Sequence, residues 1–96
     1  MATIGTFTRE GDGFVGNIAT LDLKAKATFK PIEKTVERAP DYRIYASGVE
    51  IGAAWSKISD TGNPYLSVRL DDPSFAEAIF CRLVNVGEGH ALVWSR

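Results

Sequence analysis

The sequence predicts an all-β protein, a single small antiparallel domain of seven to eight short strands. Apolar and polar residues alternate with a period of two through most of the chain. In segment 65–70, Leu66, Val68 and Leu70 fall on one side, as in a half-buried strand. Turn-forming clusters recur at roughly ten-residue intervals, which is typical of a meander curled into a barrel or of a two-sheet sandwich.

The first three strands are expected where this alternation is interrupted by turn residues. Residues 3–9 end at the Gly-Asp-Gly turn of residues 11–13, because glycine and aspartate accept the positive φ of hairpin turns. Residues 14–21 run back as the second strand, and Gly16 indicates a bulge or close backbone packing. Residues 24–30 alternate lysine with apolar positions and form the third strand.

The middle of the chain predicts a loop followed by a hairpin. Residues 31–40 form the longest irregular stretch, which is too short for a stable helix and has room for one helical turn. Residues 41–47 and 49–57 are strands joined at Gly48. The side chains expected on the core side of these two strands are Tyr42, Ile44, Ala46, Val49, Ile51, Ala53 and Trp55.

Three further strands complete the chain. A dense turn cluster precedes residues 65–70, the clearest strand. The loop that follows contains Pro73, which cannot donate to a ladder. Residues 78–84 and 90–95 are the last two strands, and Trp94 is assigned to the core because it shares parity with an inward leucine.

Length and composition restrict the class of protein. With 96 residues, no repeat and no linker, the chain is expected to be one domain spanning residues 1–96. Cys81 is the single cysteine, so an internal disulfide is excluded and a reducing cytoplasm is expected. The sequence has neither a signal-peptide pattern nor a long apolar run, and a net charge of −1 predicts no strong bulk attraction to membranes or nucleic acid.

Several long segments resemble one known family. They are MATIGTF at 1–7, APDYR at 39–43, GVEIGAAW at 48–55, YLSVRLDDPSF at 65–75 and WSR at 94–96. On these segments the chain resembles the small bacterial family catalogued as domain of unknown function 736. The resemblance implies a bacterial source and an association with plasmid and conjugative-transfer genes. It supplies no activity, cofactor or catalytic residue.

The residue inventory predicts no enzyme. Nucleophilic catalysis needs a nucleophile, a base and a group that orients the base. His90 is the only histidine, and with Cys81 it forms the single candidate nucleophile–base pair. A cysteine in a core strand and a histidine in an exposed turn are the simpler interpretation. We therefore predict no catalytic residue and no cofactor.

Metal and nucleotide signatures are equally weak. Asp71 and Asp72 could join Asp60 or Glu77 around a hard cation, but Asp-Asp-Pro is commonly the start of a loop. We predict no metal site. Residues 11–16 match Gly-x-Gly-x-x-Gly, but they fall in a hairpin and not at a strand-to-helix turn, so the dinucleotide-binding mechanism is missing.

Charge is sorted along the chain: acidic residues sit largely in expected loops, whereas basic residues sit within strands and point away from the apolar set. Some aromatic residues share that outward parity. The candidate binding residues are Lys24, Lys26, Lys30, Arg43, Tyr45, Tyr65, Arg69, Phe80 and Arg82. Cations beside aromatic rings suit single-stranded nucleic acid. Outward lysines are also ordinary protection against aggregation, and their stems cover apolar surface.

Two functions follow as hypotheses. The first is a non-enzymatic β-sheet binding module, associated with bacterial mobile elements, whose basic and aromatic face binds nucleic acid. The second is a protein-binding or homodimerising accessory protein of conjugation or counter-defence machinery. The second rests on residues 78–84, where Phe80 and Val84 make the strand apolar on its outer side as well. A homodimer without membrane contact is expected.

Overall fold

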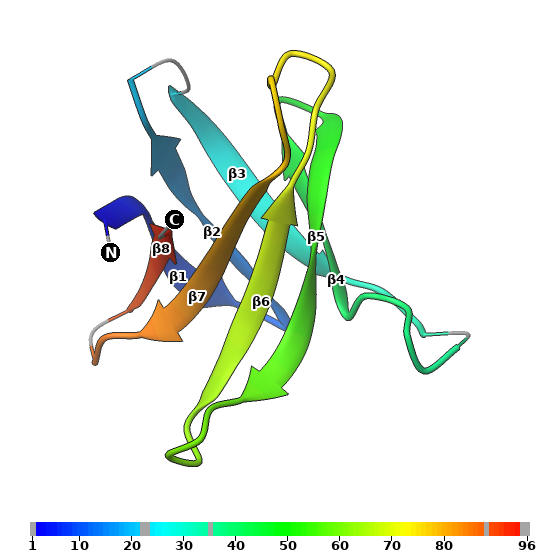
Figure 1. The fold of residues 1–96 in the computed structure, drawn as a ribbon, viewed down its shortest axis with the longest axis vertical. Helices are drawn as coiled ribbons and strands as arrows, with labels where there is room; N and C mark the ends of the chain where they lie inside the picture. Colours follow the sequence, from blue (N-terminus) through cyan, green and yellow to red (C-terminus); the bar gives the residue numbers. More distant parts are fainter. Residues whose placement is uncertain (1, 22–23, 35, 88, 95–96) are drawn as a thin grey trace.

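The structure is a computed structural model that describes residues 2–21, 24–34, 36–87 and 89–94. Its eight strands are β1 (Ala2–Glu10), β2 (Gly13–Ala19), β3 (Lys24–Pro31), β4 (Tyr42–Ala46), β5 (Val49–Ile58), β6 (Pro64–Leu70), β7 (Ile79–Asn85) and β8 (His90–Trp94). Figure 1 shows them as a meander in chain order. The all-β prediction is confirmed, and each expected strand is present. The expected end of the last strand at Ser95 lies outside the described residues.

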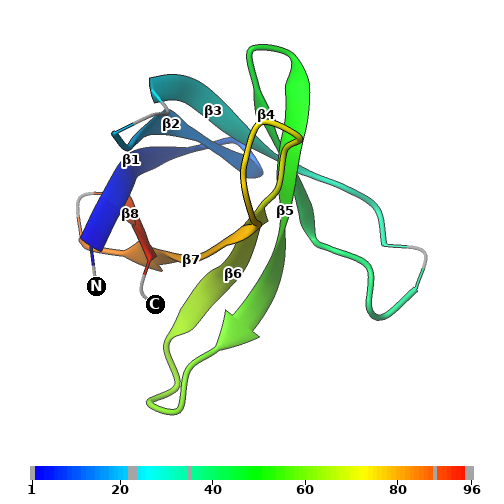
Figure 2. The ribbon, with the colours of Figure 1, turned by 45° about the horizontal axis from the view of Figure 1, so that its top comes forward.

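The sheet closes into a barrel, which decides between barrel and sandwich. Each strand pairs antiparallel with the next, and β1 pairs with β8 through Ala2 and Trp94 at one end and Phe7 and His90 at the other. Figure 2 shows the strands arranged as a ring. Closure gives each of the eight strands a partner on both sides, so pairing at an open sheet edge is not available to these strands as a route to dimerisation.

The barrel interior is filled by the inward side chains of every strand. Phe7 and Phe29 are fully buried, and their rings meet edge-to-face with centroids 5.1 Å apart. Val68 and Leu70 on β6 are also fully buried, as alternation predicts. Such a core holds the strands by apolar burial, and no polar or charged residue of the described chain is fully buried with it.

Strand β5 departs from simple alternation. The register with β4 shifts between Ile44 and Tyr45, which face Gly52 and Glu50, so Ile51 is an extra residue in β5. Ile51 is buried as expected, but beyond this bulge Ala54 is the buried residue. The prediction that Ala53 and Trp55 face the core was therefore wrong. Val49 lies at the strand end and is 54% exposed.

Gly16 allows two strands to approach closely. A Cβ placed there would collide with the carbonyl oxygen of Thr6 and with the backbone and ring of Phe7 on β1. Gly16 pairs directly with Phe7 in the ladder. The predicted role of Gly16 in close backbone packing is confirmed, and the collision explains why glycine is needed at this position.

The two ends of the barrel differ. At the end formed by the β2–β3, β4–β5 and β6–β7 connections, Phe75 of the β6–β7 loop packs against the core. The other end is formed by the β1–β2, β3–β4, β5–β6 and β7–β8 connections, and we call it the open end. It is hollowed by a cavity, described below.

The β3–β4 loop folds back on β5 and contains a turn, with Ala39 N–H bonded to the Val36 carbonyl, in place of a helix. Trp55 lies half-buried on the outer side of β5, where its indole N–H donates to the carbonyl of Arg38 at 3.1 Å. This loop therefore covers the tryptophan that alternation assigned to the core. Trp94, in contrast, packs against the core as predicted. Within the described ranges, the structure holds no helix with the length and apolarity that crossing a membrane would require.

Candidate functional site

The nine candidate binding residues point outward, but the barrel divides them into two groups. The β3–β4 cluster consists of Lys24, Lys26, Lys30, Arg43 and Tyr45, and the β6–β7 cluster of Tyr65, Arg69, Phe80 and Arg82. Strand β5 separates them, and in Figure 2 the two strand pairs lie on opposite sides of the ring. The nine residues therefore form no single continuous face.

The β3–β4 cluster is organised by strand register. Lys30 is paired with Arg43 across the ladder, and the Lys30 Nζ lies 5.4 Å from the centroid of the Tyr45 ring, as in a cation–π contact. Arg43 Nη1 is 2.8 Å from Glu50 Oε1. The hydrogen bond to Glu50, followed by its charge, raises the pKa of Arg43, so this cation is already balanced by a carboxylate.

The lysines of this cluster differ from Arg43. Lys24, Lys26 and Lys30 are exposed, and none of them forms an ion pair with a carboxylate in the described part of the chain. A shallow hollow of about 560 Å³ lies beside them and is lined by Lys26, Thr28, Lys30, Tyr45, Ser47 and Gly48. The hollow thus has two cations and a ring on its walls, and no acidic residue among those six.

The β6–β7 cluster has its cations engaged within the protein. The Arg82 guanidinium lies 5.2 Å from the centroid of the Tyr65 ring, and Arg69 Nη2 is 2.9 Å from Asp71 Oδ2. Phe80 faces Arg69 across the β6–β7 ladder and is 66% exposed. In this cluster Arg69 has a carboxylate partner and Arg82 lies over a tyrosine ring, as Lys30 does. The β3–β4 cluster differs because it contains three lysines without a carboxylate partner in the described ranges.

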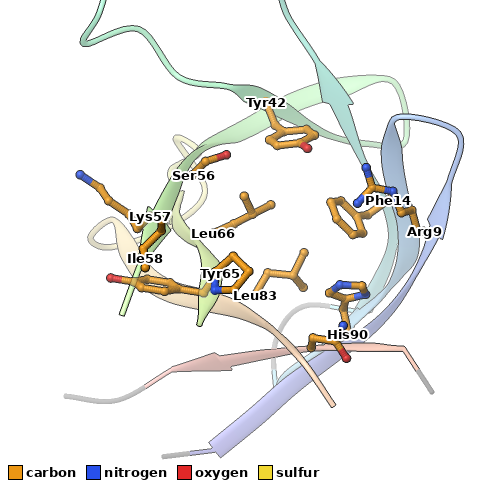
Figure 3. A pocket seen from close by; sticks show the side chains of 12 residues that line it. Arg9, Phe14, Tyr42, Ser56, Lys57, Ile58, Tyr65, Leu66, Leu83 and His90 are labelled. Atoms are coloured by element: carbon orange, nitrogen blue, oxygen red, sulfur yellow. The ribbon is translucent and has the colours of Figure 1, made fainter. Parts of the chain in front are cut away.

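Sequence reasoning did not find the cavity of about 710 Å³ that occupies the open end of the barrel (Figure 3). Phe14, Leu66 and Leu83 supply apolar surface, while Tyr42 and His90 stand at its side. These residues come from five strands, and alternation within a strand does not show that the five strands surround one cavity. In the sequence, the only indication of the cavity was that each residue lies near a strand end. That indication becomes useful only once the barrel is known to close.

The rings of this cavity contact one another. Phe14 meets His90 edge-to-face with centroids 4.8 Å apart, and it meets Tyr42 at 5.8 Å. The guanidinium of Arg9 lies over the outer part of this wall, 5.5 Å from the Phe14 ring centroid. Strands β1, β2, β4 and β8 thus build a continuous aromatic wall with a cation on it.

His90 is unusual within this wall. Its Nδ1 is buried and has no hydrogen-bond partner among the described residues. Burial, followed by the positive charge of Arg9, lowers the pKa of His90 below its ordinary value, so the imidazole is neutral at pH 7. A buried unpaired polar atom costs about 1–3 kcal/mol of stability, which makes it a feature to be explained.

Cys81 and His90 do not meet. In the β7–β8 hairpin Cys81 pairs with Trp94, whereas His90 pairs with Asn85. Four residues separate the two positions along the strand, which corresponds to about 13 Å and exceeds hydrogen-bonding reach. Cys81 is buried, and burial raises the pKa of its thiol to about 11. The thiolate that nucleophilic catalysis requires is therefore disfavoured here.

The two aspartates that follow β6 bond to residues close to them in the chain. Asp71 bonds to Arg69, and Asp72 Oδ2 accepts hydrogen bonds from the backbone N–H and the hydroxyl of Ser74, at 2.9 and 2.6 Å. These bonds from Ser74 lower the pKa of Asp72. In the described ranges, no three histidine, cysteine or carboxylate side chains gather as a metal site would require.

Comparison with known proteins places the chain in a family. The search of curated proteins and the search of solved structures found no match. A family model described as protein of unknown function, DUF736, matches residues 3–96. This match covers nearly the whole chain and agrees with the resemblance carried by its long segments. The chain therefore belongs to the DUF736 family.

Proposed function

We propose that the protein is a non-enzymatic binding module whose β3–β4 cluster binds single-stranded nucleic acid. The observation that carries this proposal is the row of exposed lysines on β3, which lack carboxylate partners in the described chain and lie beside the ring of Tyr45. The separation of Cys81 from His90 supports the non-enzymatic part.

Strand geometry gives these lysines a common direction. Lys24, Lys26 and Lys30 lie on the same side of β3, with spacings of about 7 Å between the first two and about 13 Å across Thr28. A nucleic-acid backbone that follows β3 would place phosphates near these ammonium groups. Each neutralised phosphate releases condensed counterions, which favours binding at low salt.

Tyr45 adds a stacking surface to the lysine row. It faces Thr28 across the β3–β4 ladder and is half-buried, so part of its ring remains accessible. Bases stack on such rings with little sequence preference. In the free protein the Lys30 ammonium lies over the Tyr45 ring. When a base stacks on that ring, Lys30 would move to a phosphate.

The proposal is tested by titrating fluorescein-labelled oligothymidine at several salt concentrations. Three neutralised phosphates predict a slope of about −2 in a plot of log affinity against log salt. The double variant Lys26→Glu, Lys30→Glu should lose binding. Lys57→Glu is the matched control, because it reverses a lysine charge on β5 outside the cluster. Salt-independent binding, or equal loss in the control, contradicts the proposal.

The family resemblance supplies a context for this role. It implies association with plasmid and conjugative-transfer genes, and DNA passes between cells as a single strand during conjugation. A small barrel that coats or guides such a strand would need unpaired cations and a ring, and would need no catalytic residue.

A second candidate function is self-association through the outer side of β7. Phe80, the second residue of β7, is 66% exposed near the β6–β7 connection, where a second copy could cover it. Light scattering over a wide concentration range tests this proposal. A dimer that dissociates in Phe80→Ser supports it, and a strict monomer at every concentration contradicts it.

A further inference from the structure

We propose that the open end of the barrel binds a small organic carboxylate with an apolar body, such as an aryl or alkyl acid. This site is separate from the β3–β4 cluster, and neither proposal depends on the other. It uses the cavity of about 710 Å³, whose size falls within the range of about 300–1,000 Å³ that is common for ligand sites.

The apolar body of such an acid fits the interior of the cavity. Leu66 and Leu83 are almost fully buried, and their side chains form the inner surface of the cavity (Figure 3). The Phe14 ring adds a flat surface beside them. A phenyl ring or a short alkyl chain would take up this space and remove apolar surface from water.

The carboxylate of the ligand fits the charge at the side of the cavity. Arg9 is exposed, and its guanidinium is held over Phe14 at 5.5 Å, where it can donate two parallel hydrogen bonds to a carboxylate. The twelve lining residues include no aspartate or glutamate. Positive charge is therefore uncompensated within the cavity.

His90 gives the second, independent observation. Its ring projects into the cavity between Phe14 and Leu83 (Figure 3), and its buried Nδ1 lacks a partner in the described chain. Because Nδ1 is covered, a ligand in the cavity would meet the remaining edge of this ring, which is a polar group in a largely apolar wall. The N–H of its neutral imidazole can donate to a ligand oxygen that reaches the wall.

The test is a titration of the ¹⁵N-labelled protein with benzoate, 4-phenylbutyrate and octanoate, followed by ¹H–¹⁵N correlation spectra. His90 is the only histidine, so its imidazole signals need no assignment. At least one acid should cause saturable shifts at Phe14, Leu66, Leu83 and the His90 ring. The affinity of the matching neutral amide should be lower by about tenfold or more, because the amide has no charge to pair with Arg9.

Two variants separate ligand binding from folding. Arg9→Gln should weaken binding of the acid about tenfold. Ser56→Phe places a ring at the cavity edge and should abolish binding without unfolding the barrel, because Ser56 is exposed. Arg69→Gln is the control, because this exposed arginine of β6 is not among the residues that line the cavity, and the variant should bind the acid as the wild type does.

The inference is overturned by any of three results. The first is the absence of saturable shifts at these residues with all three acids in the low millimolar range. The second is equal binding of acid and amide. The third is wild-type affinity in a folded Ser56→Phe variant.

Discussion

The carboxylate of Asp41 accepts a hydrogen bond from the backbone N–H of Ser56, and the two atoms are 2.8 Å apart. The bond joins the end of the β3–β4 loop to β5. The Asp41 N–H also donates to the carbonyl of Ala54, and Lys34 Nζ lies 3.4 Å from the other oxygen of the carboxylate. Asp41 therefore fixes the loop that covers Trp55 and borders the open end.

Replacement of Asp41 by alanine should destabilise the protein by about 1–2 kcal/mol, the usual cost of losing a charged group that accepts a backbone N–H. Chemical denaturation measures this change. Asp60→Ala in the β5–β6 turn is the control and should have little effect. Equal stability of the two variants would show that the Asp41 bond does not hold the loop.

Asp41 also predicts a dependence of stability on pH. The hydrogen bond from the Ser56 N–H is the main cause that lowers the pKa of Asp41 below 3.8, and Lys34 adds to it, while burial opposes it. The stability that the ionised Asp41 carboxylate contributes is fully present above its unfolded-state pKa near 3.8. This stability is lost as pH falls through the lower pKa of the folded state. Denaturation midpoints should decrease in this range for the wild type and less for Asp41→Ala.

Gly16→Ala should destabilise the barrel by about 1–3 kcal/mol, as overpacking usually does. The added Cβ would meet the Thr6 carbonyl and Phe7 on β1, neither of which can move without disturbing the ladder. Thermal unfolding measures the loss. Gly87→Ala is a useful contrast because open space surrounds Gly87, although its φ of 97° adds backbone strain. A Gly16→Ala protein as stable as wild type would contradict the close approach of β1 and β2.

Cys81 should be unreactive in the folded protein. Burial raises the pKa of its thiol from 9.0 to about 11, and the side chain is only 5% exposed. Iodoacetamide at pH 8 should modify the chain only after denaturant is added, as mass spectrometry can show. Because the unfolded thiol ionises first, stability should also fall as pH rises from about 9 towards about 11. Rapid modification without denaturant would contradict the burial of Cys81.

The His90 imidazole should titrate below its ordinary value of 6.5, because burial and the charge of Arg9 both disfavour its protonation. NMR of this single histidine measures the midpoint, and Arg9→Gln should move it upward. The stability that comes from keeping the His90 imidazole neutral is present above pH 6.5 and is lost as pH falls through the pKa of His90 in the folded state. A midpoint at or above 6.5 would show that His90 is neither buried nor close to Arg9.

The alternation of apolar and polar residues predicted the parts of the fold that depend on residues close together in the sequence. Leu66, Val68 and Leu70 are buried because β6 keeps a regular pleat along its whole length. The same reasoning misplaced Trp55, because one extra residue at Ile51 reverses the sides of β5. A bulge depends on the partner strand and on loop geometry, and no local pattern in β5 marks it.

The candidate binding residues illustrate the same limit. Their outward orientation follows from local parity, and it is correct for residues such as Lys26 and Arg69. Whether they share one face depends on closure, which pairs β1 with β8 and curves the sheet. The open-end cavity depends on closure entirely, because Arg9, Phe14 and His90 meet only when three strands are brought together.

The most direct test of the nucleic-acid proposal is a map of the amide signals that shift when unlabelled oligothymidine is added to the ¹⁵N-labelled protein. The proposal predicts shifts at Lys26, Thr28, Lys30 and Tyr45, decreasing as salt is raised. Residues of the β6–β7 cluster, such as Arg82, should remain unchanged. Shifts centred on the β6–β7 cluster, or no shifts at low salt, would contradict the proposal.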